Sequence, residues 1–229
     1  SANATAGAHD LWEDRGPAYA AVEAMDYSAD FYAQRAGDRI SAHDPATPMF
    51  MYLALQNVHN PYEEPPTSLV DANATFAEIA TYPRRVYAAM ALAMDLAVAR
   101  VERAYKAAGL WSDTLLVFSS DNGGIELGSN YPLRGQKVHL WEGGVRVVGF
   151  VRGTDSSLAP LSPAVVGGWT PSRMLIHSTD WLPTLLDAAV GAEADKGMFD
   201  TTTQATFDAP QTLPLDGISQ WRALQTAEA

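Results

Sequence analysis

Apolar residues recur along the chain in patterns that predict alternating helices and strands. Between residues 84 and 108 they fall three or four positions apart, the spacing of one face of a helix. Gly109 follows directly, at the position where a glycine ends many helices. We therefore expect a long helix over 84–108 with an apolar face made of Val86, Met90, Met94, Ala97, Val101, Ala104 and Ala108.

Three shorter apolar runs have the length of buried strands. They cover residues 49–55, 113–119 and 145–151, and prolines bound the first on both sides. Such runs are typical of parallel strands covered on both faces, and the pattern is also compatible with a short buried helix. With further helices expected over 27–41 and 179–189, the order predicts a doubly wound α/β sheet in one domain.

The segments between these elements are predicted to be loops and turns. Residues 61–66 contain three prolines, 201–206 are rich in threonine, and 214–217 have the composition of a turn. The first 25 residues show no clear period and are expected to form a loop. These segments connect the helices and strands without adding a predicted element.

Composition and charge exclude several classes of function. The chain has 229 residues, no cysteine, and 15 Lys and Arg against 27 Asp and Glu, so its net charge is −12. The scattered cations argue against nucleic-acid binding, and the lack of cysteine excludes disulfides and thiolate chemistry within the chain. No apolar run approaches roughly 18 residues, so the given chain predicts neither a signal peptide nor a membrane partner.

Polar residues that can carry chemistry follow the first two predicted strands. His59 lies just past the first, and Asp121 and Asn122 lie just past the second, followed by two glycines. Ligands of open parallel sheets gather at the carboxyl ends of strands, and carboxylate and amide oxygens suit Ca²⁺ or Mg²⁺. Asp-Asn-Gly-Gly is equally a common tight turn, so the motif alone leaves both interpretations open.

The loop over residues 132–146, which contains several glycines, favours the cation-site interpretation over the plain turn. It carries Arg134, Lys137, His139, Glu142 and Arg146 directly before the third predicted strand. Cationic groups beside a divalent-cation site favour an oxyanion substrate, because together they neutralise a sulfate or phosphate.

Several longer motifs follow one another along the chain. They are YLALQNVH from Tyr52, SDNGG from Ser120, LRGQK from Leu133, WEGGVR from Trp141, LIHSTDWLPTL from Leu175 and PLDG from Pro214. In this order they resemble the latter half of a sulfatase catalytic domain, most closely its arylsulfatase B (N-acetylgalactosamine-4-sulfatase) branch. The resemblance spans about residues 10–222, which predicts a partial catalytic domain over 1–222 and a tail over 223–229.

The resemblance implies an alkaline-phosphatase-like α/β fold and hydrolysis of a sulfate ester by a formylglycine made from Cys or Ser. It also implies a divalent cation, usually Ca²⁺ with Mg²⁺ as the other option, for which Asp121 and Asn122 match two ligands. Lys137 matches the lysine that binds the substrate sulfate. His59 matches the histidine that contacts the sulfate and protonates the leaving alcohol.

Other polar residues have weaker assignments. His139 and Arg134 are candidate substrate contacts, and Arg134 is alternatively a residue that orders its loop. Glu142 and Arg146 are expected to form a structural ion pair. His177 and Asp180 stand at the opening of the last predicted helix, where Ser178 or Asp180 would cap free amides, so a structural role is expected for them.

Two elements of the family pattern are missing from this sequence. These are the Cys-x-Pro-Ser-Arg motif that carries the nucleophile and the first strand that ends in a pair of aspartates. Residues 169–173 imitate the motif with tryptophan in place of the modifiable residue, and they stand in the wrong order. Ca²⁺ takes about six to eight oxygens, of which Asp121 and Asn122 supply at most about three. We therefore expect an incomplete sheet that lacks its N-terminal strands, and a chain that is inactive without the missing N-terminal half.

Two classes of function remain. One is a fragment of a sulfatase that acts on a sulfated glycan or an aryl sulfate. The other is a non-catalytic descendant that binds sulfated glycans, and a phosphatase or phosphodiesterase of the same superfamily is a further alternative. The family resemblance implies a secreted, periplasmic or lysosomal setting.

Overall fold

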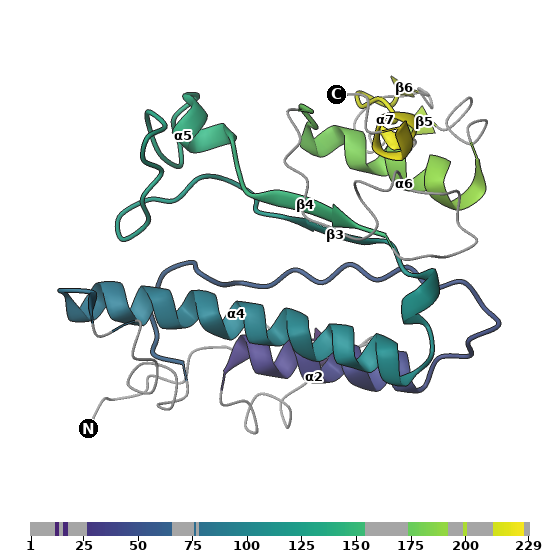
Figure 1. Cartoon of the computed structure of the whole chain (residues 1–229), viewed down its shortest axis with the longest axis horizontal. Coiled ribbons are helices and arrows are strands. Elements are labelled where there is room, and N and C mark those ends of the chain that lie inside the picture. The colour runs from purple at the N-terminus through teal and green to yellow at the C-terminus, as the bar shows by residue number, and fades with distance from the viewer. Residues whose placement is uncertain are drawn as a thin grey trace. The chain divides into compact units, whose positions relative to one another are not determined.

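A computed structural model of the chain describes residues 12–13, 16–17, 27–65, 76, 78–153, 174–191, 199–200 and 213–226. These residues belong to two compact units. Unit 1 contains Ser1–Gly109 and Asn122–Arg146, and unit 2 contains Leu110–Asp121 and Val147–Ala229. The elements in chain order (Figure 1) are β1 (Trp12–Glu13), β2 (Gly16–Pro17), α2 (Ser28–Ser41), α4 (Tyr82–Ala107), η2 (Trp111–Asp113), β3 (Leu116–Ser119), α5 (Glu142–Val145), β4 (Gly149–Arg152), η3 (Ser178–Asp180), α6 (Trp181–Val190), β5 (Phe199–Asp200), β6 (Leu213–Pro214) and α7 (Trp221–Thr226).

Unit 1 is built on the packing of α2 against α4. Both predicted helices are confirmed, and α4 ends as expected, because Gly109 has a φ of 71° and its N–H donates to the Lys106 carbonyl at 3.1 Å. Small side chains line the contact and allow the helices to approach closely. The buried residues are Ala29, Ala33, Ala36 and Ile40 of α2, and Val86, Ala89, Met90, Ala93, Ala97 and Val101 of α4.

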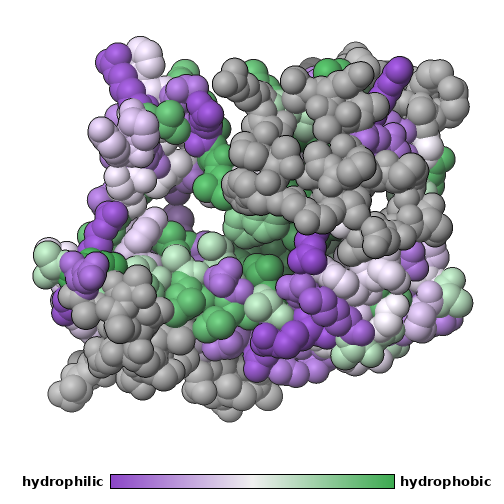
Figure 2. Space-filling view, viewed as in Figure 1, coloured by the Kyte–Doolittle hydropathy of each residue, from purple (hydrophilic) through white to green (hydrophobic). Residues whose placement is uncertain are grey.

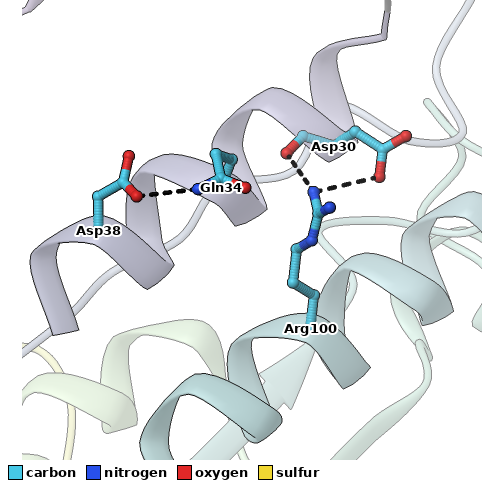
Figure 3. Close-up of polar contacts among 4 residues, drawn as sticks. All are labelled: Asp30, Gln34, Asp38 and Arg100. Atoms are coloured by element: carbon cyan, nitrogen blue, oxygen red, sulfur yellow. Dashed lines mark hydrogen bonds and ion pairs between the residues drawn. The ribbon is translucent and has the colours of Figure 1, made fainter. Parts of the chain in front are cut away.

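One exposed ion pair joins the two helices beside this apolar contact (Figure 3). Arg100 Nη1 of α4 lies 3.8 Å from Asp30 Oδ1 and 3.4 Å from the Asp30 carbonyl oxygen of α2. Such exposed pairs contribute about 0–1 kcal/mol. The buried apolar face therefore supplies most of the stabilisation between α2 and α4.

The prediction of a sheet strand over residues 49–55 is wrong, because these residues form no ladder with another described strand. Exposure alternates along it, with Phe50 77% and Tyr52 84% exposed between half-buried neighbours, so the backbone is extended. Within the described residues no second strand pairs with it, and a ladder requires a partner for its N–H and C=O groups. Apolar residues consequently reach the surface (Figure 2). This agrees with the expectation of an incomplete sheet.

Unit 2 contains the ladder between β3 and β4. The two strands are antiparallel, and the rings of Phe118 and Phe150 stack with their centroids 5.1 Å apart. Both strands start later than predicted, because Trp111–Asp113 and Glu142–Val145 form short helices instead. The antiparallel pairing differs from the parallel order expected for this pair, since the connection from 120 to 148 contains only the four-residue α5 and no crossover helix.

The C-terminal helices share a small apolar cluster in unit 2. The helix predicted over 179–189 is confirmed as α6, preceded by the single turn η3. Trp221 and Leu224 of α7 are buried against Leu115, Val151, Met174 and Ala188. The predicted boundary at residue 222 falls within α7 and stays a prediction. The loop predicted over 201–206 and the motif-like segment 169–173 lie outside the described residues.

Among the helices of the described ranges, none combines the length and the apolar character that crossing a membrane requires.

Candidate functional site

Unit 1 brings together two residues that the sequence analysis placed on separate loops. His59 and Lys137 are 78 positions apart, and His59 Nε2 lies 3.2 Å from Lys137 Nζ. The His59 side chain is exposed and Lys137 is half-buried. An imidazole and an ammonium group therefore stand side by side at the surface of this unit.

Hydrogen-bond partners define the role of each ring nitrogen of His59. Nδ1 lies 2.7 Å from the carbonyl oxygen of Asn60, which only accepts, so Nδ1 carries the proton. The neutral ring then presents Nε2 as an acceptor, and Lys137 Nζ donates to it. The ring orientation is thus fixed by one backbone carbonyl and one cation.

Asn57 anchors the loop that carries His59. Its amide nitrogen donates to the Tyr27 hydroxyl at 2.9 Å and to the Met90 carbonyl in α4 at 2.8 Å. Burial raises the pKa of Tyr27, which favours the neutral phenol at this anchor. The His59 N–H also donates to the Gln56 carbonyl at 2.9 Å and closes the turn. Asn57 belongs to the first motif, but the motif alone indicates no role for it.

Close backbone packing shapes the loop that carries Lys137. The N–H of Gly123 donates to Gly144 O at 2.9 Å, and the N–H of Gly143 donates to Arg134 O at 2.7 Å. A Cβ atom at Gly123 would overlap the carbonyl of Gly143. The first glycine of Asp-Asn-Gly-Gly is thus needed for close approach between two segments, which a tight turn alone does not require.

Tyr62 links the His59 loop to the loop that follows Asn122. Its hydroxyl donates to Glu126 Oε2 at 2.8 Å, and its ring packs edge-on against Tyr87 of α4 at 5.8 Å. Burial and the hydrogen bond to Glu126 raise the pKa of Tyr62. The sequence analysis missed this link, because a single tyrosine and a loop glutamate form no recognisable motif.

Asp121 and Asn122 follow β3 in a bend. Asp121 is exposed, and the Asn122 amide nitrogen donates to Gly123 O at 3.0 Å. One carboxylate and one amide oxygen are donors that a hard divalent cation accepts, so the chemistry of this pair fits Ca²⁺ or Mg²⁺. Within the described ranges no group of three or more His, Cys, Asp or Glu side chains gathers to complete a coordination shell.

The remaining candidates occupy the loop before β4. The Arg134 guanidinium carbon lies 3.8 Å from the ring centre of Trp141, a cation–π contact that orders the loop. His139 is exposed, and its backbone N–H donates to Gln136 O at 2.9 Å. The expected ion pair is confirmed, with Arg146 Nη1 3.4 Å from Glu142 Oε1.

The structural role expected for His177 and Asp180 is found in unit 2, but the cap is made by His177 on the single turn η3, and α6 itself has no side-chain cap. Asp180 accepts from the His177 N–H at 2.9 Å, and the His177 ring accepts from the Thr179 N–H at 3.3 Å. The second oxygen of Asp180 accepts from the Ile218 N–H at 3.0 Å. This hydrogen bond and that from His177 lower the pKa of Asp180 despite its burial.

Comparisons with known proteins show which family the chain resembles. A sulfatase family model matches residues 4–192. The chain is 38% identical over 185 residues to mouse arylsulfatase J, which covers 80% of this chain and 29% of that protein. It is 28% identical over 178 residues to rat steryl-sulfatase, covering 67% of this chain and 29% of that protein. The chain thus spans about a third of the length of these relatives.

Solved structures extend the similarity to the fold. Two crystal structures of Ps i-CgsB, one in complex with k-i-k-neocarrahexaose, are 27% and 26% identical to this chain, with TM-scores of 0.62 for the complex and 0.64. Each match covers 86% of this chain and 38% of the other. The expected alkaline-phosphatase-like α/β fold is therefore present in part, and the chain belongs to the sulfatase family.

Proposed function

We propose that this chain supplies the sulfate-binding part of a sulfuric ester hydrolase of the arylsulfatase B type. The observation that carries the proposal is the 3.2 Å approach of Lys137 Nζ to His59 Nε2. Two groups that suit an anionic ester and its leaving oxygen meet at one point of unit 1.

In this proposal Lys137 and His59 take different parts in one step. The Lys137 ammonium donates to the sulfate oxygens and balances their charge. Without substrate, Nε2 of His59 accepts from Lys137; when the Lys137 ammonium turns to the sulfate oxygens, Nε2 takes up a proton from solvent while the Asn60 carbonyl holds the ring through Nδ1. His59 gives this proton to the leaving alcohol as a nucleophile bonds to sulfur and the ester S–O bond breaks. Arg134 and His139 lie on the same loop as Lys137, where they can meet other parts of the substrate.

The metal and the nucleophile need residues outside this sequence. Asp121 and Asn122 would hold Ca²⁺, or Mg²⁺, through one carboxylate and one amide oxygen, and the bound ion would balance charge on the sulfate. The chain has no cysteine and no Cys-x-Pro-Ser-Arg motif. We therefore assign the formylglycine and the other metal ligands to an N-terminal half of the catalytic domain.

A sulfated glycan is the substrate class that we propose. The structural neighbour Ps i-CgsB was crystallised with a neocarrahexaose, which is an oligosaccharide. The net charge of −12 is compatible with such a substrate, because a sulfate site needs only a few local cations. The same proposal places the protein in a secreted, periplasmic or lysosomal setting, with no nucleic acid or membrane as partner.

Titration of the chain with inorganic sulfate, followed by ¹⁵N NMR, tests the oxyanion site. We expect sulfate to shift the signals of His59 and Lys137, and Lys137→Ala to abolish the response. Lys106→Ala is the matched control, because Lys106 pairs with Glu102 on α4 of the same unit. A wild-type chain that does not respond, or a control that loses the response as Lys137→Ala does, would contradict the proposal.

Activity measurements test the assignment of the nucleophile. We expect no turnover of an aryl sulfate or of sulfated N-acetylgalactosamine by the 229-residue chain with added Ca²⁺. Turnover that Lys137→Ala abolishes would show that the nucleophile lies within these residues. Sulfate binding without turnover, even in a protein that includes an N-terminal half, would instead support the non-catalytic glycan-binding alternative.

A further inference from the structure

A single side-chain amide connects the loop after Asn122 to the loop that carries Lys137. Asn130 Oδ1 accepts from the N–H of Gly124 at 2.9 Å, and its Nδ2 donates to Gly124 O at 2.9 Å. The same Nδ2 donates to Gly135 O at 3.2 Å. Asn130 thus uses one acceptor and two donor positions on the backbones of two segments.

The carbonyl of Gly124 is the point where this network reaches Lys137. It accepts from Asn130 Nδ2 and also from the Lys137 backbone N–H, which lies 3.2 Å away. This carbonyl therefore holds the backbone of Lys137, and the Lys137 side chain extends from there to His59. The space is also tight, because a Cβ atom at Gly124 would lie 3.4 Å from Asn130 Oδ1 and 3.1 Å from the Gly128 Cα.

We propose that Asn130 is a positioning residue that fixes Lys137 against His59 by holding the Gly124 and Gly135 backbones. The role of Lys137 in binding sulfate rests on the proposed function above. The hydrogen bonds of Asn130 require an amide, because a carboxylate of the same size would place negative charge against two carbonyl oxygens. An apolar side chain would leave the Gly124 N–H and both carbonyls without these partners.

The variant Asn130→Asp tests the proposal, with two measurements on the 229-residue chain. The first is the ring ¹⁵N spectrum of His59 without ligand. In the wild type we expect a protonated Nδ1 and an Nε2 that accepts a hydrogen bond from Lys137, and in Asn130→Asp we expect the hydrogen bond at Nε2 to be lost while Nδ1 keeps its bond to the Asn60 carbonyl. The second is the dissociation constant for inorganic sulfate, which we expect to rise roughly 10- to 100-fold, as when partners that orient metal ligands are removed.

Two control variants separate positioning from general destabilisation. Ala97→Gly weakens the fully buried α2–α4 contact of the same unit, and Gln34→Glu makes an amide-to-acid change on the exposed face of α2 (Figure 3). Both are expected to keep the His59 spectrum and to bind sulfate within about twofold of the wild type, a change below about 0.5 kcal/mol. If Asn130→Asp does not fold, Asn130→Ala carries the test, because it removes the hydrogen bonds without adding charge.

The outcomes separate this proposal from the proposed function. An Asn130 variant that keeps the His59 spectrum and the sulfate affinity of the wild type would overturn the positioning role. An Ala97→Gly variant that loses the His59 spectrum and the sulfate affinity as fully as the Asn130 variant does would also overturn the positioning role. If the wild type does not bind sulfate but Asn130→Asp still loses the His59 spectrum, the proposed function fails and the positioning of Lys137 by Asn130 is supported.

Discussion

Asp180 holds the chain before α7 to the start of α6 through one buried carboxylate. Its Oδ2 accepts from the His177 N–H at 2.9 Å, and its Oδ1 accepts from the Ile218 N–H at 3.0 Å. Thr184, fully buried in α6, accepts from the Gln220 N–H at 2.9 Å and extends the same contact. We predict that Asp180→Asn, which keeps the shape of the side chain, destabilises unit 2.

The size of the effect follows from the hydrogen bonds that the amide cannot make. Asparagine keeps one acceptor oxygen but turns an NH₂ group toward the other backbone N–H. A hydrogen bond to a charged group contributes about 1.5–3 kcal/mol, and an unpaired buried N–H costs about 1–3 kcal/mol. Allowing for overlap between these terms, we expect the free energy of unfolding to fall by about 2–4 kcal/mol. This corresponds to roughly 4–16 °C in Tm for a chain of this size.

The pH dependence has a definite sign. The pKa of Asp180 is lowered in the folded chain from its ordinary value of 3.8, chiefly by the Ile218 N–H. The stabilisation is therefore fully present above pH 3.8 and is lost as the pH falls through the lower folded pKa. The difference in stability between wild type and Asp180→Asn should be largest near neutral pH and should shrink below pH 3.8.

Thermal unfolding followed by circular dichroism, at neutral and acidic pH, measures this difference. Hydrogen exchange at the Ile218 amide reports the local contact directly and should accelerate in Asp180→Asn. Asp216→Asn is the matched control, because Asp216 is an exposed carboxylate of the same segment. The reasoning is refuted if the two variants unfold at the same temperature at neutral pH, or if their difference grows toward acid.

Two further predictions concern the loops of unit 1. Gly143→Ala should destabilise this unit by about 1–3 kcal/mol, the usual range for overpacking, because the new Cβ would lie 2.7 Å from Arg134 O. Chemical denaturation measures the loss, and Gly16→Ala, where the structure has open space, should change little. Tyr62→Phe should remove the link to Glu126, cost about 0.5–1.5 kcal/mol and raise hydrogen exchange around the loop. Unchanged exchange there would contradict a linking role.

Helices and caps were predictable because their signals are local. The apolar spacing of α2, α4 and α6 is set within a few turns of chain, and Gly109 ends α4 through its own φ of 71°. The ion pair between Glu142 and Arg146 needs only the four-residue spacing of one helical turn. Strands were predicted less well, because an apolar run shows extended backbone but not which partner, if any, completes the ladder.

Ordered motifs determined the family and named His59, Lys137, Asp121 and Asn122 as its candidate residues. Only the tertiary structure decided that His59 and Lys137 meet at 3.2 Å, and that Asn130 holds the Lys137 loop. The physical reason is that the Asn130 hydrogen bonds end on a backbone N–H and on backbone carbonyls, groups that all residues except proline carry in the same form. Such partners leave no trace in the order of side chains, so they appear only when the chain is folded.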